Sequence, residues 1–222
     1  MEQKKTIMDY DTVSLDDAGN AVVIIDQTLL PGRTELIRLK TAEEIWNAIY
    51  LLQVRGAPAI GVCAAFGIYL LAKSCKEENY DRFLAEFRKN KEYLDSSRPT
   101  AVNLSWALNR MERVVTEHAG SPTAEIVALL KKEAEEIRDE DIRVCRRIGE
   151  YGLTLLKHGD GILTHCNAGQ LATVRYGTAT APIYLGQERD YDLRVFADET
   201  RPLLQGARLT AYELLSSGVD VT

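Results

Sequence analysis

The sequence has no apolar run long enough to cross a membrane. Stretches such as Ile60 to Ala72 are interrupted by glycine and fall short of the roughly 20 residues that a bilayer requires. The first residues also lack the apolar segment of a secretory signal, because Met1-Glu-Gln-Lys-Lys leads directly into a polar stretch. We therefore expect no membrane partner and no secretion.

Paired cysteines and an excess of positive charge are missing as well. The four cysteines (Cys63, Cys75, Cys145 and Cys166) lie far apart with no C-x-x-C spacing, which argues against a disulfide framework or a zinc site and favours a reducing compartment. The chain has 27 Lys and Arg residues against 33 Asp and Glu residues, a formal net charge of −6, so we expect no nucleic-acid partner. These features predict a cytoplasmic protein.

The composition is that of a folded protein, with 45% hydrophobic and 27% charged residues. Strand-forming residues over 21–26 and 35–39, separated by a Pro-Gly turn, predict a small antiparallel sheet. A capping-box pattern at Thr41 then opens a region in which apolar residues recur at helical spacing. We predict helices near 42–53, 58–74, 79–94, 103–118 and 122–150.

The pattern changes after Tyr151. Short apolar runs predict strands at 161–165 and 193–198, with a helical stretch after the first, a helix near 204–217 after the second, and a further strand starting at Val219. This order implies right-handed parallel crossovers and an open α/β sheet. The predicted fold class is therefore α/β, with an N-terminal β plus helical domain over 1–150 and a parallel-sheet domain over 151–222.

Two polar loops, 164–170 and 197–202, follow the predicted parallel strands, where ligands bind in open sheets. The first places Cys166 between His165 and Asn167, just before a glycine and a predicted helix N-terminus that would favour a thiolate and an anionic substrate. The alternative is a small buried cysteine at a strand end, with His165 satisfied inside the sheet edge.

The second loop places Asp198, Glu199 and Arg201 close together in the chain. These charges suit either ligand contacts or a network of ion pairs that neutralise one another. We expect Pro202 to start a helix, which would bring the amide of Gln205 near the same crevice as a hydrogen-bonding group.

The segment Arg55-Gly-Ala-Pro-Ala-Ile-Gly61 has the pattern of a phosphate site. Gly56 lets the backbone approach a ligand, Pro58 suits the first helical turn, and the following N–H groups would face an anion that Arg55 helps to hold. The small residues are equally consistent with a tight contact between helices. Arg98 shows the same pattern, a cation before a turn and a helix that we expect to be capped in the region of Thr100 to Asn103. The alternative is a surface arginine that precedes a helix.

Taken together, these residues resemble the methylthioribose-1-phosphate isomerase family, which includes the regulatory subunits of the eukaryotic exchange factor for initiation factor two. The resemblance covers nearly the whole chain. It rests on four blocks in order: Arg55-Gly-Ala-Pro-Ala-Ile-Gly61, Arg98-Pro-Thr-Ala-Val-Asn-Leu104, Leu163-Thr-His-Cys-Asn-Ala-Gly169 and Ala197-Asp-Glu-Thr-Arg-Pro-Leu-Leu-Gln-Gly-Ala-Arg-Leu-Thr210. Four ordered blocks are specific, whereas any one of them would be weak.

The resemblance implies a Rossmann-like second domain, a homodimer, and an aldose–ketose isomerisation of 5-methylthioribose 1-phosphate in methionine salvage, without redox cofactor or metal. Matched by position, the residues expected to bind the substrate and its phosphate are Arg55, Gly56, Ala57, Arg98 and Gln205, and Cys166 is the expected catalytic thiol. Because phosphate blocks the anomeric oxygen, ring opening needs an acid near the ring oxygen, and hydrogen must move between C1 and C2 in a water-poor pocket. The sequence leaves proton and hydride transfer equally open.

One part of the family pattern is missing from the 222 residues. The acidic partner, an Asp in an Asp-Asn motif, follows the strand that starts at Val219, and later Asn-Lys substrate contacts follow it. Two strands and the start of a third rarely make a stable layer, so this domain is expected to be incomplete here and the native chain to continue past Thr222 by roughly a hundred residues. A chain ending at Thr222 is expected to be inactive, and to aggregate or borrow strands from another chain.

Two other functions remain open. A sibling enzyme would act on ribose 1,5-bisphosphate or 5-deoxyribose 1-phosphate, because the sequence does not place the pocket walls that select the 5-substituent. A non-catalytic regulatory subunit would bind a sugar phosphate or a nucleotide. The Thr-His-Cys-Asn-Ala-Gly segment favours an enzyme, because a protein that only binds has no chemical need for a thiol at that strand end.

Overall fold

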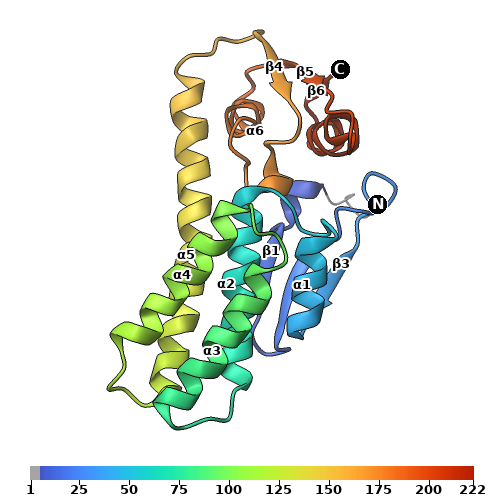
Figure 1. Ribbon diagram of the computed structural model, residues 1–222. Coiled ribbons are helices and arrows are strands. Elements are labelled where there is room, and N and C mark those ends of the chain that lie inside the picture. The colour runs from blue at the N-terminus through green and yellow to red at the C-terminus, as the bar shows by residue number, and fades with distance from the viewer. Residues whose placement is uncertain (1–5) are drawn as a thin grey trace. The chain divides into compact units, whose positions relative to one another are not determined.

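The computed structural model describes residues 6–222, which form two compact units (Figure 1). The helical unit comprises residues 13–26 and 36–140. The sheet unit comprises the described residues up to Thr12 together with 27–35 and 141–222. Helix α5 (Thr123–Leu153) carries the chain from the first unit into the second.

The helical unit begins with a small antiparallel sheet, as expected. Strands β1 (Val13–Asp16), β2 (Ala21–Ile25) and β3 (Leu36–Leu39) pair in that order, with Ile24 opposite Val13 on one side and Ile37 on the other. The central strand β2 is buried along almost its whole length, which explains its continuous apolar run. The sequence patterns did not single out β1.

Four helices and the first part of α5 complete the helical unit. The predicted helices are confirmed with small differences at their ends, and they are α1 (Ala42–Tyr50), α2 (Ala57–Ser74), α3 (Tyr80–Asp95), α4 (Val102–Glu117) and α5. The capping box also forms. The Thr41 hydroxyl accepts a hydrogen bond from the Glu44 N–H at 3.1 Å, and the Glu44 carboxylate accepts one from the Thr41 N–H at 3.0 Å.

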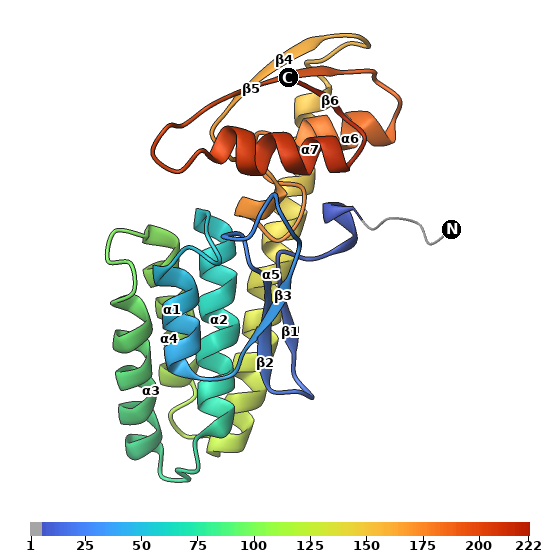
Figure 2. The ribbon, with the colours of Figure 1, turned by 90° about the vertical axis from the view of Figure 1, so that its right-hand side faces the viewer.

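Helix α2 runs through the middle of this unit, beside α1, α3, α4, β1 and β2 (Figure 2). It has 18 residues and a mean hydropathy of 1.5, so by length and composition alone it is a candidate membrane span. However, 72% of it is buried inside the structure, as in the core helix of a globular unit. A Cβ on Gly67 would lie 3.0 Å from the side chain of Ile45, so this glycine lets α1 pack closely on α2.

The sheet unit contains a three-stranded parallel sheet, as predicted. Its strands are β4 (Gly161–His165), β5 (Arg194–Asp198) and β6 (Asp220–Val221), in that order. Helices α6 (Ala181–Glu188) and α7 (Tyr212–Ser216) cover one face of the sheet (Figure 2), where their buried side chains pack against Val195. The opposite face carries Leu163 and Phe196, which are paired in register and exposed.

Two local predictions for this unit were wrong. The expected helix directly after Gly169 is only a 3-10 turn, η2 (Gln170–Ala172), and α6 begins later. The helix expected near 204–217 is confirmed as a π-helical segment, η3 (Gly206–Ala211), that continues into α7, but it does not begin at Pro202 as expected. Leu204 has a φ of 51°, so the chain is left-handed immediately before this segment and no helix extends back to Pro202.

Candidate functional site

Cys166 lies directly after β4, at the carboxyl end of the parallel sheet. Its N–H donates to the Asp198 carbonyl at 3.2 Å, which extends the pairing of β4 with β5 by one residue. Its φ is 61°, in the left-handed region that non-glycine residues rarely adopt. Strained backbone of this kind is concentrated at functional sites, because the surrounding structure must hold it in place.

Two polar side chains hold the sulfur of Cys166. The thiol donates to Oε1 of Gln205 at 3.1 Å, and the Thr200 hydroxyl donates to the sulfur at 3.3 Å. The thiol is half-buried, so it is open to a ligand while its orientation is fixed. The structure therefore places the Gln205 side chain beside Cys166, while its role in binding substrate stays a prediction.

The π-helical turn of η3 explains how one short segment reaches Cys166 twice. Gln205 contacts the sulfur, and the hydroxyl of Thr210 donates to the Cys166 carbonyl oxygen. In an α-helix, side chains five residues apart point about 140° away from each other, whereas the i→i+5 winding of a π-helix brings them to the same side. Asn167 donates to Thr210 at 3.1 Å and so joins the same network.

The charged residues of the second loop have separate roles. The Glu199 carboxylate accepts hydrogen bonds from the N–H groups of Thr200 at 2.7 Å, Gly206 at 2.8 Å and Ala207 at 3.0 Å, and thereby caps η3. Desolvation raises the pKa of this carboxyl, but the N–H donors outweigh it and the net shift is downward. Asp198 lies 3.9 Å from His165, and both side chains are more than half exposed, so this pair is screened by solvent and weak.

Three contributors to the Cys166 site were not predicted from the sequence: Thr200, Thr210 and Glu213. The first two contact Cys166 directly. Glu213 is fully buried on α7 and accepts hydrogen bonds from the loop that follows Cys166. The helix N-terminus expected behind the thiol is absent, because η2 is only a single turn and the N–H groups of Gln170 and Leu171 are bound by Glu213.

The other predicted binding residues lie in the helical unit, around the first turns of α2 and α4. Gly56 precedes α2 with a φ of 88°, a conformation that glycine adopts without strain, and Pro58 lies in the first turn. A Cβ on Gly61 would lie 3.0 Å from the Asn103 carbonyl oxygen, so these turns of α2 and α4 pack closely. The tight helix contact is therefore present, and it brings the segments bearing Arg55 and Arg98 to the same end of the unit.

The expected cap of α4 is absent. The helix is preceded by Ala101, whose side chain cannot accept a hydrogen bond, and a turn closed by the Ala101 N–H and the Arg98 carbonyl at 2.9 Å leads into it. The structure thus assembles Arg55, Gly56, Ala57 and Arg98 within one unit, and Cys166 with Gln205 within the other.

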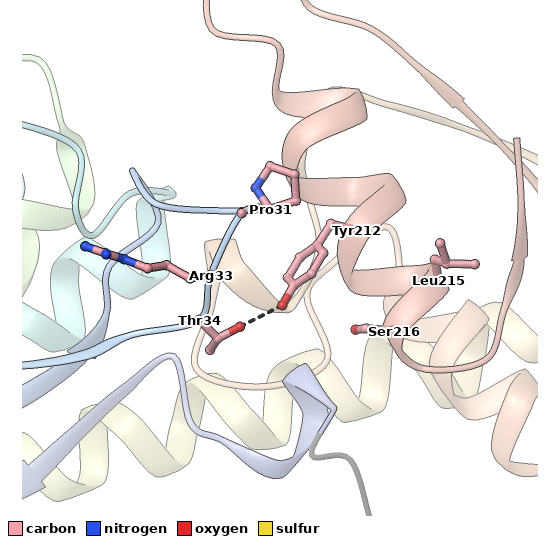
Figure 3. Close-up of a pocket in the computed structure, with 7 residues that line it drawn as sticks. Pro31, Arg33, Thr34, Tyr212, Leu215 and Ser216 are labelled. Carbon is pink, nitrogen blue, oxygen red and sulfur yellow. Dashed lines mark hydrogen bonds between the residues drawn. The ribbon is translucent and has the colours of Figure 1, made fainter.

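A cavity of about 600 Å³ lies elsewhere in the sheet unit (Figure 3). Its lining comes from 31–34 and from one face of α7: Pro31, Gly32, Arg33, Thr34, Tyr212, Leu215 and Ser216. Figure 3 shows Tyr212 directed at Thr34, with their hydroxyl groups 2.7 Å apart. None of the predicted site residues lines it. Within residues 6–222, no group of three or more His, Cys, Asp and Glu side chains is arranged to hold a metal ion.

Comparison with known proteins finds similar chains that are named as sugar-phosphate isomerases. It is 64% identical over 210 residues to a methylthioribose-1-phosphate isomerase from Symbiobacterium thermophilum, covering 95% of this chain and 58% of that protein. It is 51% identical to a 5-deoxyribose 1-phosphate isomerase from Clostridium botulinum, covering 95% of this chain and 60% of that one. The chain therefore spans about 60% of the length of these curated relatives.

Among solved structures, the crystal structure of 5-methylthioribose 1-phosphate isomerase from Pyrococcus horikoshii OT3 superimposes with a TM-score of 0.90 at 43% identity. The match covers 98% of this chain and 60% of that one. The sequence model described as the Initiation factor 2 subunit family matches residues 53–222, which include Arg55, Arg98, Cys166 and Gln205. The protein therefore belongs to the Initiation factor 2 subunit family.

Proposed function

We propose that the protein is an aldose–ketose isomerase that converts 5-methylthioribose 1-phosphate to 5-methylthioribulose 1-phosphate in methionine salvage. The observation that carries this proposal is the half-buried thiol of Cys166, held between Thr200 and Gln205 at the carboxyl end of the parallel sheet. The 64% identity to a protein of that name supports the choice of substrate.

The proposed chemistry uses the thiol in its protonated form. The S–H group donates a hydrogen bond to the Gln205 amide oxygen, and the sulfur accepts one from the Thr200 hydroxyl. These two contacts fix the orientation of the thiol. An acid so placed suits ring opening of a sugar whose anomeric oxygen carries phosphate, and hydrogen then moves between C1 and C2. The reaction is an isomerisation, so the atoms balance without a redox cofactor.

We place the substrate phosphate at the first turn of α2, with Arg55, Gly56 and Ala57 as its ligands and Arg98 as a second cation. The positive φ of Gly56 and the packing of α2 on α4 support this placement, because N–H groups of a helix's first turn bind anions. Gln205 would contact the sugar beside Cys166.

A second candidate substrate is 5-deoxyribose 1-phosphate, because a relative at 51% identity carries that name. The two sugars differ only in the 5-substituent, so the same thiol and phosphate ligands would serve both. A regulatory subunit that only binds its ligand is the non-enzymatic alternative.

The test is an assay of the gene product, as its gene encodes it, on 5-methylthioribose 1-phosphate, 5-deoxyribose 1-phosphate and ribose 1,5-bisphosphate. We expect kcat/KM to be highest for the first sugar, with the ketose product identified by NMR. Preference for another of the three would change the substrate and keep the reaction class. Binding of all three without turnover would replace the enzyme with a regulatory subunit.

We further propose a cytoplasmic homodimer. Four free cysteines support a reducing compartment, and the homodimer rests on the resemblance to the isomerase family. Sedimentation of the gene product at micromolar concentration tests the dimer, and a single monomeric species would overturn it.

A further inference from the structure

Glu213 is a fully buried carboxyl that the proposed chemistry does not use. It lies on α7 with no exposed surface, and a charged side chain is almost never buried in this way without polar partners. Its Oε1 accepts the N–H of Gln170 and its Oε2 accepts the N–H of Leu171, each at 3.1 Å. One carboxyl group therefore holds two consecutive residues of the loop after Cys166.

Gly169 leaves the space that this carboxyl occupies. A Cβ at Gly169 would lie 1.3 Å from Oε1 of Glu213, so no other residue type fits while the carboxyl remains in place. The constraint is spatial, because the φ of Gly169 is −96° and open to any residue. Glycine and glutamate thus form one matched pair, and it lies three residues after the thiol.

The helical segment that carries Glu213, with its N-cap Gln205, also carries two side-chain contacts to Cys166, while Thr200 supplies a third from the preceding loop. Gln205 meets the sulfur, Thr210 meets the Cys166 carbonyl and Asn167, and Glu213 meets Gln170 and Leu171. Residues 205–216 therefore bind the loop 166–171 at its start and at its end. A shift of the loop end along the helix would change the position of the thiol relative to Gln205.

We propose that Glu213 is a positioning residue, which fixes the loop 166–171 on the helix so that the strained backbone at Cys166 holds its sulfur against Gln205. The inference rests on the proposed function in taking Cys166 as the reacting thiol. Glu213 itself touches no substrate, and it acts through the backbone that it binds.

The test is Glu213→Gln, which keeps the volume but replaces one accepting oxygen with an NH₂ group that faces an N–H donor. We expect kcat on 5-methylthioribose 1-phosphate to fall on the order of tenfold or more while KM changes less than about threefold. We also expect iodoacetamide to alkylate Cys166 at least about three times faster relative to Cys75, because the loosened loop exposes the thiol. Cys75, half-buried in the helical unit, is the internal reference in the same molecule.

The matched control is Asp141→Asn. Asp141 is another carboxyl of the sheet unit and is partly buried, and it accepts the Val174 N–H at 2.7 Å, outside the loop 166–171. Its variant should leave both the kcat and the alkylation ratio near wild type. Equal effects of the two variants, or a folded Glu213→Gln protein with both readouts unchanged, would overturn the proposal.

If Glu213→Gln does not fold, Glu213→Asp gives the same two readouts with a shorter carboxylate that keeps its charge. The alkylation ratio needs no substrate. A wild-type protein inactive on every sugar phosphate would therefore refute the proposed function, while the alkylation ratio would still decide the positioning role.

Discussion

At the scale of single residues, the chemistry depends on one sulfur between Thr200 and Gln205. We expect Cys166→Ser to lower kcat on the order of a hundredfold or more with little change in KM, because a serine hydroxyl is a far weaker acid than a thiol and the substrate contacts stay in place. Cys75→Ser, at a half-buried cysteine of the other unit, is the matched control and should keep full activity. Near-normal turnover in Cys166→Ser would remove the thiol from the mechanism.

Arg55 is the residue on which the phosphate proposal depends. Charge-assisted hydrogen bonds contribute roughly 1.5–3 kcal/mol each, so Arg55→Ala should weaken substrate binding about ten- to a hundredfold. Arg55→Lys should recover only part of this, because an ammonium group lacks the bidentate fork of a guanidinium. Calorimetric titration into Cys166→Ser protein measures binding without turnover.

The control for Arg55 is Arg82→Ala on α3, where the arginine is exposed and its only described ion pair is a 4.0 Å contact with Glu77. Its substrate affinity should match wild type. Unchanged affinity in Arg55→Ala would leave the first turn of α2 as a packing junction with α4.

The sequence was sufficient to locate Cys166 and Gln205 near each other, because both follow strands of a parallel sheet and such ends share an edge. It was not sufficient for Thr200 and Thr210. Their contacts depend on the left-handed backbone at Cys166 and on the π-helical winding of η3, and neither has a signature in residue spacing.

At the scale of elements, η3 depends on close approach of its first residue to the end of β5. A Cβ on Gly206 would lie 2.4 Å from the Asp198 carbonyl oxygen. This oxygen belongs to the backbone, so it cannot move aside by a change of side-chain rotamer. We expect Gly206→Ala to lower the free energy of unfolding by about 1–3 kcal/mol through overpacking, and to lower kcat because the adjacent Gln205 is displaced from the sulfur.

Gly120→Ala is the control for this substitution. Gly120 lies in the turn after α4, and nothing lies within 4 Å of the position that its Cβ would take. Its stability should stay within about 0.5 kcal/mol of wild type. Urea unfolding of both variants measures the difference, and equal stabilities would mean that the backbone near Asp198 yields easily.

The two units differ in how far their elements could be predicted from the sequence. The helices of the helical unit follow from apolar periodicity and from a capping box that forms as expected. The prediction of a helix directly after Gly169 was wrong because the N–H groups of Gln170 and Leu171 are bound by Glu213, more than forty residues later. A long-range side-chain acceptor of this kind leaves no local pattern.

At the scale of the whole molecule, the two units carry carboxyl groups with opposite pKa shifts. In the helical unit, hydrogen bonds from Lys73, Tyr69 and Lys131 hold the pKa of Asp17 well below its usual range. The stability that this group contributes is present above the pKa of an unfolded Asp and is lost only as the pH falls through strongly acidic values. Asp17 therefore adds no pH dependence between pH 5 and pH 8.

In the sheet unit the pKa shift of Glu213 has the other sign. Burial raises the pKa of this carboxyl from 4.5 to about 7, although its hydrogen bonds, chiefly that from the Leu171 N–H, oppose the rise. Between these values the folded state binds more protons than the unfolded state, so stability falls as the pH rises and levels off above the folded pKa. From pH 5 to pH 8 this one group should cost about 2–3 kcal/mol of unfolding free energy. Glu213→Gln, which cannot ionise, should abolish that part of the loss.

Pulse alkylation in urea separates the units, because Cys145 is buried in the sheet unit and Cys63 in the helical unit. Comparing wild type and Glu213→Gln at the same pH cancels the pH dependence of the thiols themselves and the titration of Asp141, which both proteins share. The urea midpoint reported by Cys145 should fall between pH 5 and pH 8 by more in wild type than in the variant, while the Cys63 midpoints should change equally in both. An identical pH response at Cys145 in the two proteins would mean that Glu213 ionises in the folded state as readily as in the unfolded chain, and that burial does not govern its titration.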